Sequence, residues 1–263
     1  MEKVTGTVIC QKEIEADIFD LQVRAPEIAA QARPGQFAAL YCRDRSRMLP
    51  RPISLCGFDA EAGTIRLVYR TAGAGTREFS ALREGDALEL TGPLGNGFPL
   101  EEARGRRVLL IGGGIGIPPM LAAAWALAGE PAAERPAAVT AVLGYRSSLF
   151  LAEEFAAFAE VAAATEDGSA GTQGTVLDAL RENSLEGDVI FACGPRPMLR
   201  ALQTYAREQG IACWLSLEER MACGVGACLA CVCETAETDT HSHVHNARIC
   251  RDGPVFAAEA VVL

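Results

Sequence analysis

The sequence is poor in basic residues, in aromatic residues and in long apolar runs. Lys and Arg number 24 against 34 Asp and Glu, which gives a formal net charge of −10. A protein without a basic face cannot neutralise a phosphate backbone, so we expect no nucleic-acid partner. No run approaches the roughly 18 apolar residues of a membrane span, and no basic stretch followed by an apolar run opens the chain. We therefore expect a soluble, cytoplasmic protein with no membrane partner.

Cysteine is the abundant exception, and half of the ten cysteines lie between positions 223 and 250. Their order is Cys223-x4-Cys228-x2-Cys231 with a distant Cys250, which is the spacing of plant-type [2Fe-2S] ligands. A zinc site with four thiolates is the alternative, although zinc ribbons usually pair two short C-x2-C units. The other cysteines are expected to be reduced thiols, because the chain is long and lacks an export signal.

Two different rhythms of apolar residues divide the chain. The first hundred residues alternate short apolar runs with turn signals, which predicts an antiparallel β-barrel. From about position 105 onward, strand-like runs alternate with helical stretches, which predicts a parallel sheet covered by helices on both faces. We expect three domains: a barrel over 1–102, an α/β domain over 103–216 and a small cysteine-rich module over 217–263.

The expected elements follow from these rhythms. Barrel strands are expected over Val4–Gln11, Ile18–Val23, Gln36–Cys42, Arg51–Phe58, Thr64–Arg70 and Ala87–Thr91. Sheet strands are expected over Val108–Ile111, Val139–Leu143, Val161–Thr165, Val189–Cys193 and Ile211–Leu215. Helices are expected over Arg77–Leu82, Pro118–Ala128, Ala152–Glu160, Val176–Glu182 and Pro197–Gln209.

The first strand-to-helix turn of the α/β domain is rich in glycine. Glycines from Gly112 to Gly116 let a pyrophosphate approach the backbone, and the helix that follows favours negative charge at its N-terminus. The run departs from G-x-G-x-x-G, and a glycine-rich turn can equally serve tight packing. A second turn, Cys193-Gly194-Pro195, is expected to reach the same edge of the sheet. The candidate nucleotide contacts are Gly113, Gly114, Gly116, Cys193, Gly194 and Pro195.

Two segments of the barrel are candidates for flavin binding. The segment Arg51-Pro52-Ile53-Ser54 offers a guanidinium for a pyrophosphate and a hydroxyl for the edge of a flavin ring. Alone, it also fits an ordinary edge strand. Downstream, Val68-Tyr69-Arg70 precedes Gly75 and Thr76, where glycines and a threonine expected to cap the next helix make a phosphate cradle.

Together these motifs resemble the iron-sulfur electron-transfer subunits of type B dihydroorotate dehydrogenase. The resemblance rests on Arg51–Ser54, Gly92-Pro-Leu-Gly-Asn-Gly97, Gly112–Pro119, Cys193–Pro195, Glu218–Cys228 and Cys250-Arg-Asp-Gly-Pro-Val-Phe256. It spans nearly the whole chain. The cysteine block with Asp-Gly-Pro-Val-Phe is specific, whereas the flavin and nicotinamide motifs are shared across the ferredoxin reductase superfamily.

The resemblance implies a barrel that binds FAD, a central domain that binds NAD and a module that holds a [2Fe-2S] cluster. It assigns FAD contacts to Arg51, Pro52, Ile53, Ser54, Val68, Tyr69, Arg70, Gly75 and Thr76, and the cluster to Cys223, Cys228, Cys231 and Cys250. It also implies a separate FMN-containing catalytic subunit that oxidises dihydroorotate to orotate in pyrimidine (UMP) biosynthesis, within a heterotetramer of two copies of each subunit. We assign no general acid or base to this chain.

Two other functions remain open from the residues. One is the NADPH-linked flavin and iron-sulfur subunit of a sulfide dehydrogenase or transhydrogenase-type complex, for which Arg146-Ser147-Ser148 could bind a 2′-phosphate. The other is a zinc-stabilised interaction module without enzymatic activity.

Two local features depart from the family pattern. Ile53 stands where related reductases place an aromatic residue on the flavin, which leaves Tyr69 as the candidate for stacking. His241, His243 and His245 alternate along one strand face and could bind a metal, although we expect a solvated hairpin tip. Cys233 is expected to be a spare buried thiol.

Overall fold

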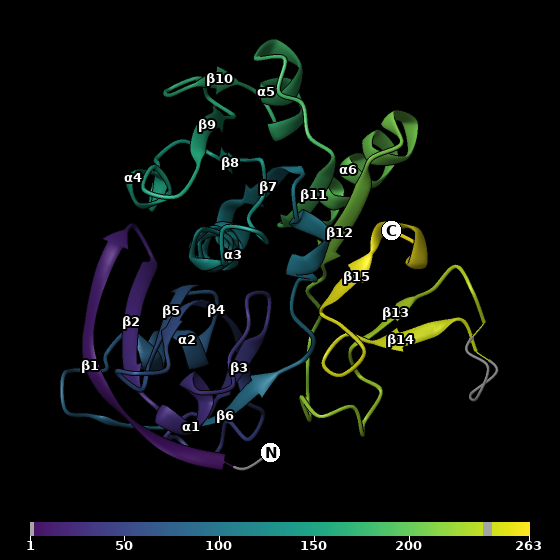
Figure 1. Cartoon of the computed structure of the whole chain (residues 1–263). Helices are drawn as coiled ribbons and strands as arrows, with labels where there is room; N and C mark the ends of the chain where they lie inside the picture. The colour runs from purple at the N-terminus through teal and green to yellow at the C-terminus, as the bar shows by residue number, and fades with distance from the viewer. Residues whose placement is uncertain (1–2, 239–243) are drawn as a thin grey trace.

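The computed structural model describes residues 3–238 and 244–263 and contains a barrel, a seven-stranded sheet and a small C-terminal module (Figure 1). The barrel is closed and antiparallel, with strand order β1-β2-β5-β4-β3-β6, as the alternating pattern predicts. Its strands are β1 (Lys3–Glu15), β2 (Ile18–Arg24), β3 (Phe37–Leu40), β4 (Arg51–Asp59), β5 (Thr64–Arg70) and β6 (Ala87–Leu94). Helices α1 (Pro26–Ala29) and α2 (Ala74–Phe79) lie in the connections between these strands.

Alternation along β5 decides what faces the barrel core and what faces the next domain. Leu67 and Tyr69 lie inside the barrel and are almost fully buried. Arg66, Val68 and Arg70 therefore point outward, because successive side chains of a strand lie on opposite faces. Val68 is nevertheless buried, since it packs in a cluster with side chains of the second domain.

The second domain is built on a sheet with strand order β10-β9-β8-β7-β11-β12-β15. Its parallel strands are β7 (Arg107–Gly113), β8 (Ala138–Tyr145), β9 (Glu160–Thr165), β10 (Thr172–Gln173), β11 (Val189–Cys193) and β12 (Ala212–Ser216). Helices α3 (Ile117–Gly129) and α4 (Ala152–Phe155) cover the face that packs on the barrel, and α5 (Val176–Glu182) and α6 (Arg196–Gln209) cover the other face. The alternation of strands and helices predicted this arrangement, which the structure confirms.

The C-terminal module contributes a strand to that same sheet. It contains the hairpin of β13 (Val232–Glu234) and β14 (Asn246–Arg248), followed by β15 (Val255–Ala257). Strand β15 pairs antiparallel with β12 at the edge of the sheet. The side-chain amide of Gln203 on α6 also donates hydrogen bonds to the carbonyl oxygens of Ala258 (2.6 Å) and Val261 (2.8 Å). The module is therefore joined to the second domain by backbone and side-chain contacts that the sequence pattern did not predict.

Two helix predictions require correction. The helix expected over Ala152–Glu160 ends at Phe155, whose carbonyl closes a turn that releases Glu160 to pair with β8. The helix expected over Arg77–Leu82 is α2, which begins at Ala74. Thr76 is not its N-cap: the Thr76 hydroxyl lies in the first turn and accepts hydrogen bonds from the preceding backbone amides of Ala72 and Gly73.

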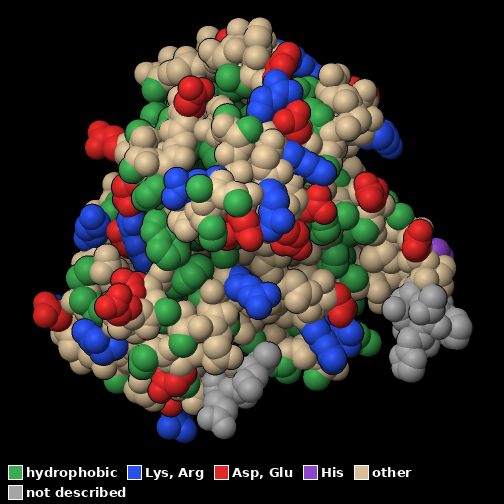
Figure 2. All heavy atoms as spheres, in the orientation of Figure 1, with side chains coloured by type: hydrophobic (Ala, Val, Ile, Leu, Met, Phe, Trp, Pro, Cys, Tyr) green, Lys and Arg blue, Asp and Glu red, His purple; other side chains and the backbone are tan. Residues whose placement is uncertain are grey.

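The molecular surface carries both signs of charge. On the face shown in Figure 2, basic and acidic side chains are interspersed. Within the described parts of the chain, no helix combines the length and hydropathy needed to cross a bilayer. All ten cysteines are free thiols, as expected for reduced cysteines.

Candidate cofactor-binding sites

The barrel opens between β4 and β5 at the residues predicted to bind flavin. The pairing of these two strands ends at Leu55 and Leu67. Beyond that point, among the described residues, Arg51–Ser54 pairs with β3 alone and Val68–Arg70 pairs with β2 alone. The backbone groups that face each other across the opening are therefore available to a ligand, which fits the edge of a flavin ring.

The Arg51 side chain lies directly over Gly75 in the first turn of α2. A Cβ atom at Gly75 would lie 2.6 Å from the Cζ atom of Arg51, so glycine leaves the room that this guanidinium occupies. The Nη1 atom of Arg51 donates hydrogen bonds to the carbonyl oxygens of Arg47 and Leu49, which orient the group. A guanidinium held beside the amides of a helix start fits a pyrophosphate.

The Tyr69 ring lies inside the barrel and does not face the opening. Its side chain is 1% exposed, its hydroxyl donates to the Oε1 atom of Gln11 at 2.8 Å, and its ring stacks on Phe19. Burial raises the pKa of Tyr69 above its ordinary value. The expectation that this ring stacks on a flavin is therefore wrong, because Tyr69 shares the inward face of β5 with Leu67. Its predicted cofactor contact is limited to the backbone.

Packing between two turns explains two of the four glycines at the end of β7 and in the turn that follows. A Cβ atom at Gly113 would lie 2.5 Å from the Sδ atom of Met198, and one at Gly116 would lie 2.6 Å from the amide nitrogen of Gly194. Strands β7 and β11 are neighbours, so the glycine-rich turn and the Cys193-Gly194-Pro195 turn meet at one edge of the sheet, as predicted. Tight packing, which the sequence left open, accounts for Gly113 and Gly116.

Gly114 is the glycine of this turn with open space beside it. Its φ angle is +52°, and the nearest atom to a Cβ at this position would be the Nη2 atom of Arg70 at 4.0 Å. The left-handed backbone favours glycine, and the open side leaves room for a nucleotide phosphate. The same contact places Arg70, a predicted flavin residue, beside the predicted nucleotide turn.

Cys193 ends β11 beside this turn and stays a neutral thiol. Burial raises the pKa of Cys193 to about 12, although a hydrogen bond with Ser216 partly opposes the shift. A protonated thiol is a poor nucleophile and a poor metal ligand. Cys193 therefore offers a small, neutral surface, which suits contact with a nicotinamide ring.

An acidic pair that sequence reasoning missed lies next to the turn after β8. The amides of Glu166 and Asp167 donate to the carbonyl oxygens of Tyr145 (3.1 Å) and Arg146 (3.4 Å), which brings the two turns together. Hydrogen bonds from Ser169 lower the pKa of Asp167. Carboxylates at the carboxyl end of a parallel strand suit a ribose hydroxyl and repel a 2′-phosphate. Their position directly after a predicted strand was the signal that could have identified them.

The predicted cluster cysteines lie in two pairs. The Cys223 and Cys228 side chains lie close enough for Cys228 to lower the pKa of Cys223, and the amide of Cys250 donates to the Sγ of Cys231 at 3.4 Å. Within residues 3–238 and 244–263, no three His, Cys, Asp or Glu side chains converge as they would on one metal ion. Two pairs of thiols suit the two irons of a [2Fe-2S] cluster better than they suit the tetrahedral geometry of one zinc ion.

Backbone amides of the cluster loop point at the same sulfur atoms. The amide of Gly226 donates to the Sγ of Cys250 at 3.1 Å, and the amide of Ala227 donates to the Sγ of Cys223 at 3.3 Å. Gly224 and Gly226 have φ angles of +70° and +82°, and this left-handed backbone favours glycine at both positions. Amide donors of this kind stabilise thiolates and influence the potential of a bound cluster.

The loop also gives its thiols different pKa values. Burial opposes ionisation of Cys223, but hydrogen bonds from the amides of Val225, Cys228 and Ala227 lower its pKa to about 6. Burial raises the pKa of Cys250 to about 12, together with its contact with Cys231. Cys223 is therefore ready to ligate as a thiolate at neutral pH, whereas Cys250 needs the positive charge of a metal to lose its proton.

The end of β6 forms the wall between the barrel and the cluster loop. A Cβ atom at Gly224 would lie 3.7 Å from the Cδ1 atom of Leu94, and Leu94 pairs with Phe37 on β3. Next to this wall, the Asn96 side chain donates to the carbonyl oxygens of Arg251 (3.2 Å) and Asp252 (2.9 Å). These bonds fasten the turn after Cys250 to the barrel.

Cys233 and the three histidines had no settled role in the sequence. Cys233, on β13 of the hairpin, is buried and lines a cavity of about 140 Å³ with Gly194 and Pro195, so this cavity lies between the hairpin and the nucleotide turn. His241 and His243 lie outside the described residues. His245 has its Nε2 atom 2.8 Å from the hydroxyl of Thr238.

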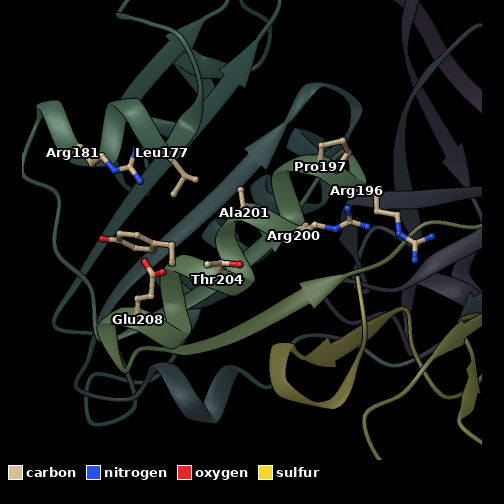
Figure 3. A pocket seen from close by; sticks show the side chains of 9 residues that line it. Leu177, Arg181, Arg196, Pro197, Arg200, Ala201, Thr204 and Glu208 are labelled. Carbon is tan, nitrogen blue, oxygen red and sulfur yellow. The ribbon is translucent and has the colours of Figure 1, made fainter.

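A groove of about 610 Å³ runs between α5 and α6, on the sheet face away from the barrel (Figure 3). Its basic residues are Arg181 from α5 and Arg196 and Arg200 from the first turns of α6. In Figure 3, Arg181 points from α5 toward α6, and Arg200 points toward Arg196. Arg196 also pairs with Glu219 at 3.6 Å. None of the predicted flavin, nucleotide or cluster residues lines this groove, so we assign it no part in the candidate sites.

Two family models match this chain. The iron-sulfur cluster binding domain of dihydroorotate dehydrogenase B matches residues 218–262, and an oxidoreductase NAD-binding domain matches residues 110–204. The first match covers all four predicted cluster cysteines, and the second covers the glycine-rich turn and the turn at Cys193.

Curated relatives match over the full length. The electron transfer subunit of dihydroorotate dehydrogenase B (NAD(+)) from Geobacillus sp. (strain WCH70) is 42% identical over 100% of both chains. The subunit of the same name from Bacillus caldolyticus is 44% identical over 98% of this chain and 97% of its own. A third, from Listeria monocytogenes, is 44% identical over 97% of each.

Solved structures share the architecture. A chain from the structure of an NADH-dependent reduced ferredoxin-NADP oxidoreductase has a TM-score of 0.85 at 32% identity and covers 98% of this chain and 89% of its own. The ferredoxin NADP+ reductase from Neisseria gonorrhoeae, solved with FAD and NADP, has a TM-score of 0.65 at 17% identity over 80% of this chain. The second likeness shows the fold alone.

Proposed function

The chain belongs to the family of dihydroorotate dehydrogenase B (NAD(+)) electron transfer subunits, and on that premise we propose how its residues divide the work. The subunit carries electrons from a separate catalytic subunit through a [2Fe-2S] cluster and FAD to NAD+. In this proposal the catalytic subunit contains FMN and oxidises dihydroorotate to orotate, in the pathway that makes pyrimidines. The NADPH-linked sulfide dehydrogenase or transhydrogenase alternative is not favoured, because the full-length curated relatives carry the dihydroorotate dehydrogenase name.

The division of labour follows from electron counting. NAD+ accepts a hydride with two electrons, a [2Fe-2S] cluster carries one electron, and a flavin exchanges both. The chain's own part is to bind and orient. Arg51 and the start of α2 hold a pyrophosphate, the open edges of β4 and β5 hold a ring, and Gly114 admits the nucleotide. The amides of Gly226 and Ala227 stabilise the sulfurs of the cluster loop.

The observation that carries the proposal is that the three candidate sites follow one another in the required order. Arg70, at the end of β5, lies beside Gly114 in the nucleotide turn. On the other side of the barrel opening, β4 pairs with β3, and Phe37 of β3 pairs with Leu94, which contacts the cluster loop at Gly224. Two strand spacings, about 10 Å in total, separate β4 from β6. A flavin in the opening would therefore lie between the nucleotide and the cluster.

We place the docking site of the catalytic subunit at the exposed rim of the cluster loop. Val225 and Leu229 are 43% and 60% exposed there, and Cys228 is exposed between them. Apolar side chains that surround an electron-transfer loop suit a protein partner. An assembly of two copies of each subunit and a cytoplasmic location complete the proposal, and ten cysteines that form no disulfide agree with a reducing compartment.

Loss of one cluster ligand tests the electron path. Cys228→Ser removes an exposed ligand, and Cys10→Ser removes an exposed thiol from β1 that lies outside the module. In complex with the catalytic subunit, Cys228→Ser should lose iron and dihydroorotate-dependent NAD+ reduction, while NADH oxidation by ferricyanide continues through the flavin. Cys10→Ser should keep both activities. A wild-type pair that oxidises dihydroorotate with artificial acceptors but never reduces NAD+ would refute the function.

Disruption of the rim tests the docking site. Leu229→Asp should abolish co-purification with the catalytic subunit and leave the flavin and iron content unchanged, because a charge buried at an interface is costly. Leu149→Asp, at an exposed leucine of the second domain, is the matched control. Normal assembly of the Leu229→Asp variant would exclude the rim as the docking site.

A further inference from the structure

An arginine on the outer face of β5 joins the barrel to the second domain. The Arg66 guanidinium donates to Asp20 of β2 through Nε (3.0 Å) and Nη2 (2.8 Å). The same group donates to Glu154 of α4 through Nη1 (2.5 Å) and Nη2 (2.8 Å). One side chain therefore forks onto two carboxylates, one in each domain.

The cluster runs from a buried carboxylate to an exposed one. Asp20 is 3% exposed, Arg66 is 21% exposed and Glu154 is 45% exposed, so the barrel half of the cluster is buried and the interdomain half lies at the rim. Lys12 approaches the Asp20 carboxylate only to 4.0 Å, so Arg66 supplies its hydrogen bonds. Because Asp20 holds the guanidinium in place, the two bonds to Glu154 start from a fixed donor, and bidentate charge-assisted bonds fix geometry better than single exposed pairs do.

Arg66 lies on the same face of the same strand as two predicted flavin residues. The side chains of residues 66, 68 and 70 all point out of the barrel, because every second residue of a strand lies on the same face. Arg66 and Arg70 therefore lie at the two ends of the part of β5 that faces the second domain. At the far end, Arg70 lies beside the nucleotide turn at Gly114. Between them, Val68 packs among side chains of the second domain. A rotation that frees Arg66 from Glu154 would therefore move Arg70 relative to Gly114.

A second contact crosses the same domain boundary from the neighbouring strand. Phe58 of β4 meets Trp125 of α3 edge to face, with ring centroids 5.5 Å apart, and Trp125 is 45% exposed. An edge-to-face pair has a preferred geometry but contains no hydrogen bond. Of these two contacts, the Arg66 cluster is the one made of hydrogen bonds.

We propose that Arg66 is a positioning residue for hydride transfer, which sets the angle between barrel and second domain by bonding Asp20 and Glu154 together. This inference rests on the proposed function, because it assumes a flavin in the barrel opening and a nucleotide at Gly114. Hydride transfer needs the reacting atoms aligned at close contact, so a small change in domain angle slows the reaction without removing any group that touches a cofactor.

Glu154→Gln tests the interdomain half of the cluster and leaves the Arg66 to Asp20 bonds in place. The matched control is Glu186→Gln, because Arg107 forks onto Asp188 and Glu186 in the same way but wholly within the second domain. Two measurements are compared: the rate of flavin reduction by NADH in a stopped-flow instrument, and hydrogen exchange of β5 and α4 peptides by mass spectrometry. The second needs no turnover.

Glu154→Gln should slow flavin reduction roughly tenfold with unchanged NADH affinity, and should speed hydrogen exchange in β5 and α4. Glu154→Asp, which keeps a carboxylate, should recover part of the rate, and Glu186→Gln should match wild type in both measurements. A normal reduction rate in Glu154→Gln, or an equal loss in Glu186→Gln, overturns the proposal. Wild-type protein that binds flavin but is not reduced by NADH refutes the proposed function itself, before any variant is compared.

Discussion

Replacement of Gly75 by alanine should weaken FAD binding and leave the fold intact. The new methyl group would lie 2.6 Å from the Cζ atom and 2.9 Å from the Cδ atom of Arg51, so the guanidinium must move. Arg51 is a flexible side chain with its head held by the carbonyls of Arg47 and Leu49, so it can swing away without disturbing the backbone. The loss falls on the ligand that the guanidinium would bind.

The expected magnitude follows from one lost charge-assisted contact. Such a contact contributes about 1.5–3 kcal/mol, which corresponds to a dissociation constant about 10- to 150-fold higher. Stability should move little or in the opposite direction, because alanine in a helix is favoured over glycine by at most about 1 kcal/mol. That gain is offset by the hydrogen bonds that Arg51 leaves behind.

The assay is titration of flavin-free protein with FAD, followed by flavin fluorescence, beside urea unfolding of the same samples. Gly129→Ala is the matched control, since Gly129 ends α3 and a Cβ there would have no atom within 4 Å. It should bind FAD as wild type does. If Gly75→Ala binds FAD with wild-type affinity, the guanidinium over Gly75 does not hold the cofactor and the assignment of this cradle fails.

Three further predictions concern other contacts. Asn96→Asp puts a carboxylate against two carbonyl oxygens, so it should lower the free energy of unfolding by about 1–3 kcal/mol and release iron. The control is Asn183→Asp, whose amide bonds lie within the second domain and which should keep its iron. Retention of iron in both variants would contradict this prediction. Hydrogen bonds from Arg66 lower the pKa of Glu154 below its ordinary value, so the stability difference between wild type and Glu154→Gln should be constant at neutral pH and shrink as pH falls through the lowered pKa. Denaturation at several pH values measures it, and a pH-independent difference would count against the bond. Because burial raises the pKa of Cys193 to about 12, the pH profile of flavin reduction should lack a thiol ionisation near about 8.5, and an inflection there that Cys193→Ser removes would refute this.

Local pattern was sufficient for elements whose signal lies within their own residues. Strand β5 and helix α5 have the predicted bounds. In α5 the signal is a capping box, in which the Thr175 hydroxyl accepts from the amide of Asp178 while the Asp178 carboxylate accepts from Thr175. Strand β15 could not be predicted in this way, because three residues carry no period and its partner β12 is distant in the sequence.

The candidate site was predictable in composition but not in geometry. The cysteine spacing identified a ligand set, whereas the pairing of Cys223 with Cys228 and of Cys231 with Cys250 appears only when the loop is folded. The inward direction of Tyr69 was knowable, since a residue two positions from a core leucine shares its face. The reason for Gly113 could not be predicted from the sequence. Glycine is needed there for packing, because Met198 approaches it from another turn.

The edge position of β15 has a consequence for how the protein is made. Strand β12 ends at Ser216 and β15 begins at Val255, so all four cluster cysteines are translated between the two partners. While this stretch is being synthesised, β12 is an unpaired edge strand of the sheet. An unpaired edge strand can pair with the strand of another chain and cause aggregation. The whole stretch that carries the cluster cysteines must therefore be synthesised before β15 can cover that edge.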